Sequence, residues 1–300
     1  MRRKQLLKAA ITALLCLSVS ACGVKVPQEN IGNFEFDAGN YPRMGGSIAA
    51  LPFGEAVTAA VLGIDRRETE EYITFDGSTT SNYTSLVDGR FDILIAYEPS
   101  EEAMEYARER GFEWEIRPVG RDALVFIVNI DNTVVSLTDG QIRGIYSGEI
   151  TNWSEVGGKN AEIIPYQRNK ESGSQTLFDK LLNMGGDLME PPGKLVLETM
   201  IGLLEVVADY ENSGGAMGYT VYYYLTNMEK EKLENTRILA IGGVECNNDT
   251  IRSGKYPYVN DFYVVIPANL PEDAPAKVLA DWICSEQGKD LAERENYVAL

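Results

Sequence analysis

The 300-residue sequence predicts an α/β fold, with mixed sheets flanked by helices. Short apolar runs alternate along the chain with longer segments whose apolar residues recur at helical spacing, and this alternation is typical of α/β proteins. Residues 92–97 and 123–128 are apolar over most of their length, as expected of strands that are buried on both faces. No repeat period or low-complexity tract interrupts this order.

Five elements are expected in the first part of the folded region. Residues 47–63 begin with a turn and become helical, and 71–75 form a short strand. A short helix over 81–89 ends at a glycine, and 92–97 form the first buried strand. Residues 101–111 carry many charges and also end at a glycine, so we expect them to form a helix on the surface.

The second part continues the alternation from the buried strand at 123–128. The strand expected at 163–166 runs directly into a polar segment that begins at Gln167. In order, the expected elements are a helix over 136–146, a strand over 163–166, a long amphipathic helix over 195–210, strands over 216–219 and 256–267, and a helix over 275–294.

The N-terminus has the features of a bacterial export signal and is not expected to be part of the fold. Basic residues occupy positions 2–4, and the apolar run at 9–17 is too short for a permanent membrane span. Small residues lead up to Cys22, and this arrangement resembles a lipobox, the signal for cleavage before the cysteine and attachment of diacylglycerol to its sulfur. The alternative is a plain cleaved signal peptide, in which Cys22 has no role.

Under the lipobox interpretation, residues 1–21 are removed and Cys22 anchors the protein to the cell membrane from the outside. Residues 22–38 are polar and unpatterned, so we expect them to form a tether between the membrane and the folded region. The remaining residues, about 260, are enough for one large two-lobed unit or for two ordinary domains.

The chain is strongly acidic, with 27 basic and 45 acidic residues. Removal of residues 1–21 takes away four basic residues, which leaves 23 basic and 45 acidic residues and a formal charge of −22. Such a surface disfavours nucleic acid and anionic membranes as partners, although solubility or halotolerance also accounts for it. An anion site in this chain must therefore depend on local, directed donors.

The chain has no histidine, which limits the chemistry that it can carry. Serine or cysteine nucleophiles that depend on histidine are excluded, as are zinc and iron sites with histidine ligands. We expect no cofactor and no metal. Cys246 and Cys284 remain after export, and they either form one disulfide or stay as two buried thiols.

The most informative segment is 167–182, where an arginine precedes a hydroxyl-and-glycine turn and the start of a helix. The first N–H groups of a helix lack intrahelical partners and lie at the positive end of its dipole. Ser172 and Ser174 add hydroxyl donors, and Gly173 allows close approach of the backbone. Arg168 can offer two donors to one oxyanion. An anion site and an N-capped surface helix beside a solvated arginine are both consistent with this segment alone.

Two further turns have the same composition. The Gly-Gly-Ser turn at 45–47 precedes the first helix, and residues 76–82, with Ser78 and Thr79, connect a strand to the next helix. In open α/β sheets, ligands bind at the carboxyl ends of strands, where such turns collect. The three turns together favour a converging cradle of N–H and hydroxyl groups, although serine and threonine also cap helices without binding a ligand.

With these turns, the chain resembles the phosphate-binding lipoproteins of bacterial ABC phosphate importers, which are part of the type II periplasmic-binding-protein superfamily. The resemblance covers roughly residues 40–295. Its most specific pieces are Ile-Tyr-Ser-Gly-Glu-Ile-Thr-Asn-Trp-Ser-Glu-Val-Gly-Gly at 145–158, Arg168 with the Ser-Gly-Ser turn at 172–174, Gly-Ala-Met-Gly-Tyr at 215–219 and Gly-Lys-Tyr-Pro at 254–257. In the segment 145–158, Ile150 and Trp153 are expected to pack in the core.

The resemblance implies a two-lobed fold in which two hinge strands join α/β lobes and an anion binds in the cleft between them. It implies that residues 39–127 and 258–300 form lobe 1 and that residues 128–257 form lobe 2. The ligand-binding residues that it implies are Ser47 and Ile48 with their amides, Ser78 and Thr79 in lobe 1, and Arg168, Ser172, Gly173 and Ser174 in lobe 2.

The sequence departs from the family at two positions of lobe 1. Ile48 follows Gly-Ser where the family usually has a hydroxyl residue, which leaves backbone donors there. The family also places an aspartate after the strand equivalent to 93–96, where it accepts the proton that phosphate keeps near neutral pH. In this chain the position falls on Tyr97 or Glu98, and Glu98 either serves as the acceptor or is an exposed residue.

The resemblance implies a monomeric lipoprotein that captures inorganic phosphate and delivers it to the permease subunits of an ABC importer. A second hypothesis keeps the fold but assigns it another oxyanion or a small acidic solute, or makes the protein a ligand sensor. A third hypothesis is an enzyme with Ser78 or Ser172 as nucleophile, but the sequence provides no evident base for either serine.

Overall fold

The predicted export signal at 1–21, the predicted anchor Cys22 and the tether residues 23–27 lie outside the residues that the structure describes. The tether prediction is wrong for the end of the 22–38 range, because Phe36 is 3% exposed and is part of the apolar core. Within the described part of the chain, no helix is both long enough and apolar enough to cross a membrane. The computed structural model describes residues 28–29, 31–32, 34–182, 189–190, 193–209 and 214–300.

Helices and strands alternate along most of the chain. The helices are α1 (Leu51–Leu62), α2 (Thr79–Val87), α3 (Glu101–Glu109), α4 (Asp139–Tyr146), α5 (Gly173–Leu182), α6 (Met200–Ala208), α7 (Asn248–Arg252), α8 (Pro275–Ile283) and α9 (Glu286–Arg294). The strands are β1 (Met44–Gly46), β2 (Ile93–Ala96), β3 (Trp114–Asn129), β4 (Ser136–Leu137), β5 (Ile164–Pro165), β6 (Gln167–Arg168), β7 (Val196–Leu197), β8 (Ala216–Val221), β9 (Thr236–Ile238), β10 (Ala240–Ile241), β11 (Val259–Pro267) and β12 (Val298–Ala299). Short 3₁₀ turns include η1 (Ile48–Ala50) and η2 (Arg66–Glu71).

The main sheet contains both parallel and antiparallel strand pairs. Its strands pair in the order β1-β2-β11-β3-β8-β5. β1 is parallel to β2 and β5 is parallel to β8, whereas β11 is antiparallel to both β2 and β3. β3 pairs with β11 as far as Ala123 and with β8 from Leu124 onward. This mixture confirms the predicted α/β class with mixed sheets.

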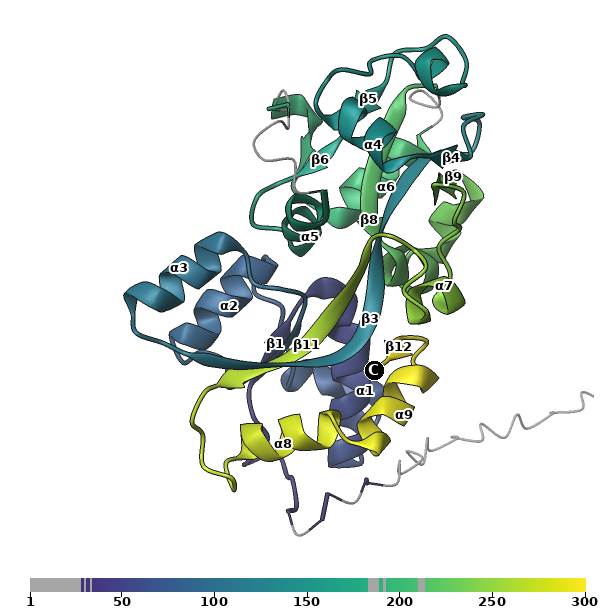
Figure 1. Ribbon diagram of the computed structural model, residues 1–300. Helices are drawn as coiled ribbons and strands as arrows, with labels where there is room; N and C mark the ends of the chain where they lie inside the picture. The colour runs from purple at the N-terminus through teal and green to yellow at the C-terminus, as the bar shows by residue number, and fades with distance from the viewer. Residues whose placement is uncertain (1–27, 30, 33, 183–188, 191–192, 210–213) are drawn as a thin grey trace, which may run out of the picture.

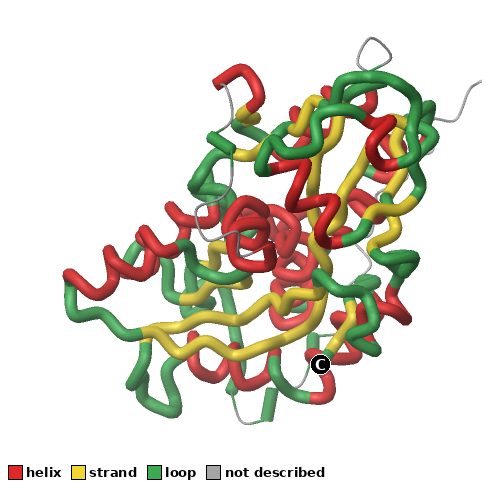
Figure 2. The backbone as a smooth tube through the Cα atoms, turned by 45° about the horizontal axis from the view of Figure 1, so that its top comes forward, coloured by secondary structure: helices red, strands yellow, loops and turns green. Residues whose placement is uncertain are grey.

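Two bodies of structure are arranged along the long strand β3, as Figure 1 shows. β1, β2, most of β11 and helices α1, α2, α3, α8 and α9 surround one end of β3, and we refer to them as lobe 1. The strands from β4 to β10 and helices α4, α5 and α6 surround the other end and are called lobe 2. The tube view in Figure 2 shows helices on both sides of the strands.

The two crossings between the lobes lie side by side. β3 leaves lobe 1 near Leu124, and the chain returns to lobe 1 at the start of β11. The N–H of Leu124 donates to the carbonyl of Tyr258 at 2.9 Å, which joins the two crossings. The fold is therefore two-lobed with two hinge crossovers.

The structure confirms the helices predicted at 47–63, 81–89, 101–111 and 136–146, and caps set their ends. Gly63 ends α1 in the left-handed region at φ 64°. Ser78, Ser100 and Thr138 cap α2, α3 and α4, so α4 begins three residues after the predicted start and residues 136–137 form β4 instead.

Two helix predictions are wrong in extent, and side-chain caps explain both. The helix predicted over 195–210 begins at Met200, because Thr199 accepts a hydrogen bond from the N–H of Gly202 at 3.1 Å. The helix predicted over 275–294 is two helices, α8 and α9. Ser285 caps α9, and a Cβ on Gly288 would lie 2.1 Å from the carbonyl oxygen of Ile283, so the chain turns tightly there.

The strand predictions are confirmed for the buried runs and wrong for one short segment. The strand predicted at 71–75 is reduced to one isolated bridge, between Ile73 and Met44. The 3₁₀ turn η2, which starts with a capping box at Asp65, extends to Glu71 and takes up the first predicted residue. β3 begins nine residues before the predicted start at 123. In this extension it pairs with β11, with an irregular register between Phe262 and Tyr263 that accommodates Gly120.

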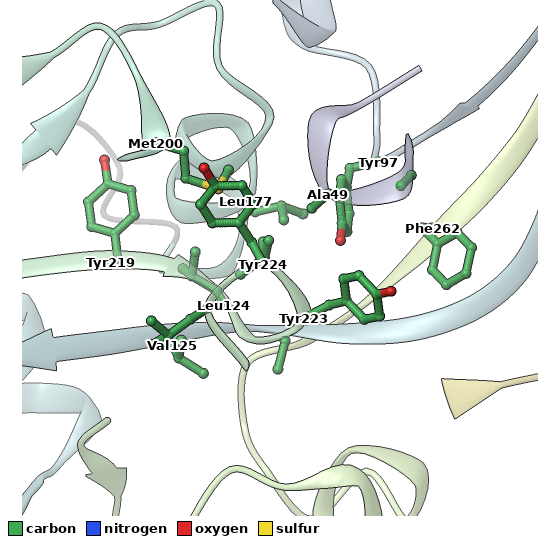
Figure 3. Packing of buried hydrophobic residues seen from close by; sticks show 14 of the residues in the cluster. Ala49, Tyr97, Leu124, Val125, Leu177, Met200, Tyr219, Tyr223, Tyr224 and Phe262 are labelled. Carbon is green, nitrogen blue, oxygen red and sulfur yellow. The ribbon is translucent and has the colours of Figure 1, made fainter. Parts of the chain in front are cut away.

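A large apolar core runs through both lobes and along β3, and a smaller one lies between α2, α3, β2 and β11. Figure 3 shows the part between the lobes, where Tyr97, Phe262 and Tyr223 gather beside the strands. The rings of Tyr223 and Tyr297 are stacked with centroids 3.6 Å apart, and those of Phe178 and Tyr219 are stacked at 4.4 Å. This aromatic packing fixes the edges of both lobes where they face each other.

Candidate functional site

A cavity of about 100 Å³ lies between the lobes. Its volume is well below the roughly 300–1,000 Å³ of pockets for drug-sized ligands, so it suits a small ion or molecule. Residues from several segments that are far apart in the sequence line it, and eight of them were predicted as ligand-binding. These eight are Ser47, Ile48, Ser78, Thr79, Arg168, Ser172, Gly173 and Ser174.

The first wall of the cavity is the end of β1 with the turn η1. The hydroxyl of Ser47 accepts a hydrogen bond from the N–H of Tyr97 at 3.0 Å and lies 3.1 Å from the hydroxyl oxygen of Thr79. The N–H of Ser47 donates to the carbonyl of Ile95 at 3.0 Å, so it is engaged within the sheet. A Cβ on Gly46 would lie 2.1 Å from the same carbonyl oxygen, which shows that this glycine serves strand packing.

The second wall is the N-terminal end of α2. Ser78 is its N-cap, since the Ser78 hydroxyl accepts from the N–H of Ser81 at 3.0 Å. The capping role that the sequence left open for this serine is therefore present, and the residue also borders the cavity. Thr79 follows as the first helical residue and is 5% exposed.

Arg168, on β6, is the most unusual residue of the cavity because it is 8% exposed and pairs with no acidic side chain among the residues that the structure describes. Its Nε donates to the carbonyl of Leu197 at 3.0 Å, and one Nη donates to the carbonyl of Glu198 at 3.0 Å. Among the residues that the structure describes, no carboxylate lies within ion-pair distance of it. Burial lowers the pKa of Arg168, but arginine stays charged at neutral pH.

The third wall is the turn that starts α5. Ser172 accepts from the N–H of Gln175 at 3.1 Å, and Ser174 lies 3.5 Å from a guanidinium nitrogen of Arg168. A Cβ on Gly173 would lie 2.7 Å from the hydroxyl oxygen of Thr79. Glycine is therefore needed at 173 so that the α5 turn of lobe 2 can approach the α2 turn of lobe 1.

Unpaired backbone N–H groups are concentrated at this cavity. Buried N–H groups nearly always have a partner, and each one without a partner costs about 1–3 kcal/mol. They lie at or next to helix N-termini, where the helix dipole adds positive potential. In the described part of the chain, the cavity residues at the starts of η1, α2 and α5 whose N–H has no hydrogen-bond partner include Ile48, Ala49, Thr79, Gly173 and Ser174. Together with Arg168, these groups can donate to several oxygens of one small anion.

Sequence reasoning missed several residues that also line the cavity. Thr199 caps α6 by accepting a hydrogen bond from the N–H of Gly202. A threonine just before an apolar helical segment is a common N-cap, and this signal could have identified Thr199 from the sequence. Asn169 donates from its amide to the carboxylate of Glu198 at 2.7 Å, and nothing in the sequence indicated that pairing. Glu198 is the one carboxylate-bearing residue among the cavity residues described.

Tyr97, one of the two residues on which the family's aspartate position was predicted to fall, lines the cavity. Its hydroxyl donates to Asp122 at 2.6 Å, and Figure 3 shows the ring beside Ala49. Asp122 also accepts from the N–H groups of Ala123 at 2.7 Å and Tyr223 at 3.0 Å. Burial raises the pKa of Asp122 to about 6, and these three hydrogen bonds limit the rise.

Glu98 does not border the cavity, in contrast to its predicted place among the ligand-binding residues. Its carboxylate forms an ion pair with Lys180 of α5 and accepts a hydrogen bond from the hydroxyl of Tyr263 at 2.9 Å. The side chain is 21% exposed, so it is neither the acceptor inside the cavity nor a freely solvated residue. The partners lie on α5 and β11, far from Glu98 in the sequence, which is why sequence reasoning did not find them.

The two cysteines in the described part of the chain are free thiols. Cys246 and Cys284 are each partly buried and do not form the disulfide that the sequence left open. Burial raises the pKa of both thiols. The described residues include no group of three or more cysteine, aspartate or glutamate side chains that could hold a metal ion.

Comparison with known proteins gives a family match and several relatives that are named for phosphate binding. Residues 74–287 match the family model of the PBP superfamily domain. The chain is 23% identical over 265 residues to the phosphate-binding protein PstS of Borreliella burgdorferi, which covers 86% of this chain and 89% of that protein. It is also 23% identical over 261 residues to PstS of Bacillus subtilis, with 86% and 81% covered.

Solved structures show the same architecture. A substrate-binding protein assigned to a phosphate ABC transporter of Clostridium perfringens, crystallised with bound phosphate, has a TM-score of 0.67. It is 22% identical, and the match covers 86% of this chain and 98% of that one. An ABC-type phosphate transport receptor from Vibrio cholerae has a TM-score of 0.62 at 22% identity, with 85% and 98% covered.

The family model spans well over half of the chain, and these structural likenesses agree with its two-lobed, mixed-sheet fold. The chain therefore belongs to the PBP superfamily and has the type II fold.

Proposed function

We propose that this protein is an extracytoplasmic solute-binding lipoprotein that captures inorganic phosphate between its lobes and delivers it to an ABC importer. The observation that carries the proposal is Arg168, a buried guanidinium with no carboxylate partner in the described part of the chain. A buried charge without a partner is costly, and an anion in the adjacent cavity would compensate it. The relatives that are named for phosphate binding support inorganic phosphate as this anion.

Binding needs no covalent step. A tetrahedral oxyanion has four oxygens, and the described residues of the cavity offer one guanidinium, several unpaired N–H groups and several hydroxyls. Hydrogen bonds to a charged group contribute about 1.5–3 kcal/mol each, more than neutral ones. Because donors come from both lobes, bound phosphate would hold the lobes together, and the closed form would be the one that the permease recognises.

We propose the lobe boundaries that the sequence predicted: residues 39–127 with 258–300, and residues 128–257. The change of partner along β3 supports a boundary within this strand, but a few residues before 127, since β3 pairs with β11 up to Ala123 and with β8 from Leu124. A protease cut engineered at each crossover would test this division. Loss of phosphate binding after either cut, with both lobes still folded, is the expected result.

We propose that Cys22 carries the lipid and that the mature protein acts as a monomer. The argument for the lipid is the lipobox-like sequence alone, because these residues lie outside the described part. Mass spectrometry of the exported protein would show diacylglycerol on a peptide that begins at Cys22. A mature peptide without the lipid, or one that begins elsewhere, would contradict the anchor.

We also propose that the protein is not an enzyme. The hydroxyl oxygens of Ser78 and Ser172 accept hydrogen bonds from the N–H groups of Ser81 and Gln175, as helix caps do. Neither serine has a basic side chain as a hydrogen-bond partner among the described residues. Incubation with ester and phosphoester substrates should release no product.

The test of phosphate binding is Arg168→Ala, measured by titration calorimetry. Truncation of one partner of a buried charged pair costs about 2–5 kcal/mol, so phosphate affinity should fall at least about 30-fold. Arg252→Ala is the matched control, because Arg252 pairs with Glu293 on the surface away from the cavity. Unchanged affinity in Arg168→Ala, with a native circular dichroism spectrum, would rule out this site.

A second candidate function is the binding of another oxyanion or a small acidic solute, either for transport or as a ligand sensor. The observation that favours it is in lobe 1, where the hydroxyl of Tyr97 donates to Asp122, and Glu98 lies outside the cavity and pairs with Lys180. Neither side chain supplies a carboxylate acceptor for a protonated ligand oxygen. Competition between phosphate and sulfate separates the two candidates.

A further inference from the structure

Glu98 joins the two lobes outside the cavity. It follows β2 in lobe 1, and its Oε1 accepts a hydrogen bond from the hydroxyl of Tyr263 on β11 at 2.9 Å. The same oxygen accepts from the Nζ of Lys180, which lies on α5 in lobe 2. Lobe 1 thus holds the carboxylate in place from one side, and lobe 2 supplies the opposite charge.

A second contact joins the same two surfaces nearer the cavity. The N–H and the hydroxyl of Thr80 both donate to the carbonyl of Glu171, at 3.3 and 3.1 Å. Glu171 lies just before α5, and Thr80 lies in the first turn of α2. α5 is therefore bound to lobe 1 at two places, through the turn that starts the helix and through Lys180 two turns later.

The Glu98–Lys180 pair is separate from the ligand cavity. Neither residue is among those that line it. The side chain of Lys180 is 55% exposed, so the pair lies at the surface where the lobes meet. A change at either residue should leave the donors of the cavity in place and should affect how long the lobes stay together.

We propose that Glu98 and Lys180 form an interlobe clasp that slows the release of the bound ligand. The proposal rests on the proposed function, because it assumes that the ligand is held between the lobes. Exposed ion pairs contribute little by themselves, and Tyr263 increases this contribution by fixing the carboxylate before the lobes meet. The clasp acts on the dissociation rate, since the two side chains meet only when the lobes are together.

The test is the dissociation rate of inorganic phosphate from the purified protein, measured by stopped-flow fluorescence. Lys180→Met and Glu98→Gln should each raise this rate about two- to fivefold and leave the association rate unchanged. Methionine keeps the helix propensity and the apolar stem of lysine at position 180. The double variant should release phosphate no faster than the faster single variant.

The charge-swapped variant, Glu98→Lys with Lys180→Glu, tests the pairing itself. It should release phosphate more slowly than either single charge reversal. Lys289→Met is the matched control, because Lys289 pairs with Glu286 one turn away on the exposed face of α9. Rates equal to wild type in both single variants, or additive effects in the double variant, would overturn the clasp.

A separate measurement distinguishes failure of the clasp from failure of the proposed function. If wild type binds no phosphate, the phosphate proposal fails, and the clasp is then tested by small-angle scattering without ligand. The radius of gyration should be larger for Lys180→Met than for wild type and Lys289→Met in low salt, and the difference should shrink in high salt. Equal radii in low salt would overturn the clasp.

Discussion

At the scale of single residues, two buried ionisable side chains stand out. Arg168 and Asp122 are 8% and 2% exposed, and neither forms an ion pair within the described chain. The guanidinium borders the cavity, while the carboxylate lies where β3 changes partner. In a chain with a formal charge of −18, the arginine gives the cavity a local positive charge that the overall surface opposes.

Asp122 should make stability depend on pH in a recognisable direction. Burial raises its pKa to about 6 in the folded protein, against about 3.9 in an unfolded chain. The folded state therefore holds a proton that the unfolded state releases between these values. Its contribution to stability is fully present below about pH 4 and is lost as the pH rises through about 6.

The expected size of this effect is about 3 kcal/mol, from two pH units of proton binding. The free energy of unfolding of wild type, minus that of Asp122→Asn, should fall by up to this amount from pH 4 to 7. Urea denaturation at a series of pH values measures it. Asp273→Asn, a change at an exposed carboxylate, is the control. A difference between wild type and Asp122→Asn that does not vary with pH would contradict the assignment.

At the level of elements, caps decide where helices begin, and the C-terminal pair shows it most clearly. The hydroxyl of Ser285 accepts from the N–H of Gly288 and donates to the carbonyl of Trp282 at 2.6 Å. Ser285→Ala should lower the free energy of unfolding by about 1 kcal/mol, as for other N-caps. Ser285→Asp, which keeps a capping oxygen, should stay close to wild type in the same denaturation experiment. Equal stability of Ser285→Ala and wild type would mean that packing alone determines where α8 ends and α9 begins.

The element order could be predicted because buried strands and glycine stops are local signals. The strand at 123–128 is apolar throughout, and α1 ends at Gly63 in the left-handed conformation. The errors occur where a partner distant in sequence decides the outcome. The first half of β3 is polar in places and contains Pro118, and it is a strand because β11 pairs with it.

Residues of the candidate site could likewise be predicted where the signal is local, and could not where it depends on a partner distant in sequence. Arg168 and the Ser-Gly-Ser turn at 172–174 are neighbours in sequence, so a single segment indicated an anion site. Tyr97 and Glu98 could not be placed by such reasoning, because their partners Asp122 and Lys180 come from other strands and helices. As a result, Glu98 was predicted to bind the ligand but lies outside the cavity, whereas Tyr97 borders it.

For the whole molecule, the ligand should raise the melting temperature, since it would bind the folded protein and not the unfolded chain. At a phosphate concentration 100 times the dissociation constant, mass action adds about 2.7 kcal/mol, which is a shift of about 5 °C for a protein of this size. Thermal-shift measurements with phosphate, sulfate, molybdate and amino acids test this. A shift with phosphate alone supports the phosphate proposal. An equal shift with sulfate favours the second candidate, and no shift with any anion contradicts both.

The C-terminal strand β12 has a practical consequence for how this protein is studied. Val298 and Ala299 pair with Arg121 and Gly120 of β3, next to Asp122 at the crossing between the lobes, and the N–H of Leu300 donates to Val119. Any purification tag or fluorescent protein fused after Leu300 would emerge beside the hinge. Rates measured on such a fusion would include the effect of the fused protein on the hinge, so untagged protein is the better choice for kinetics.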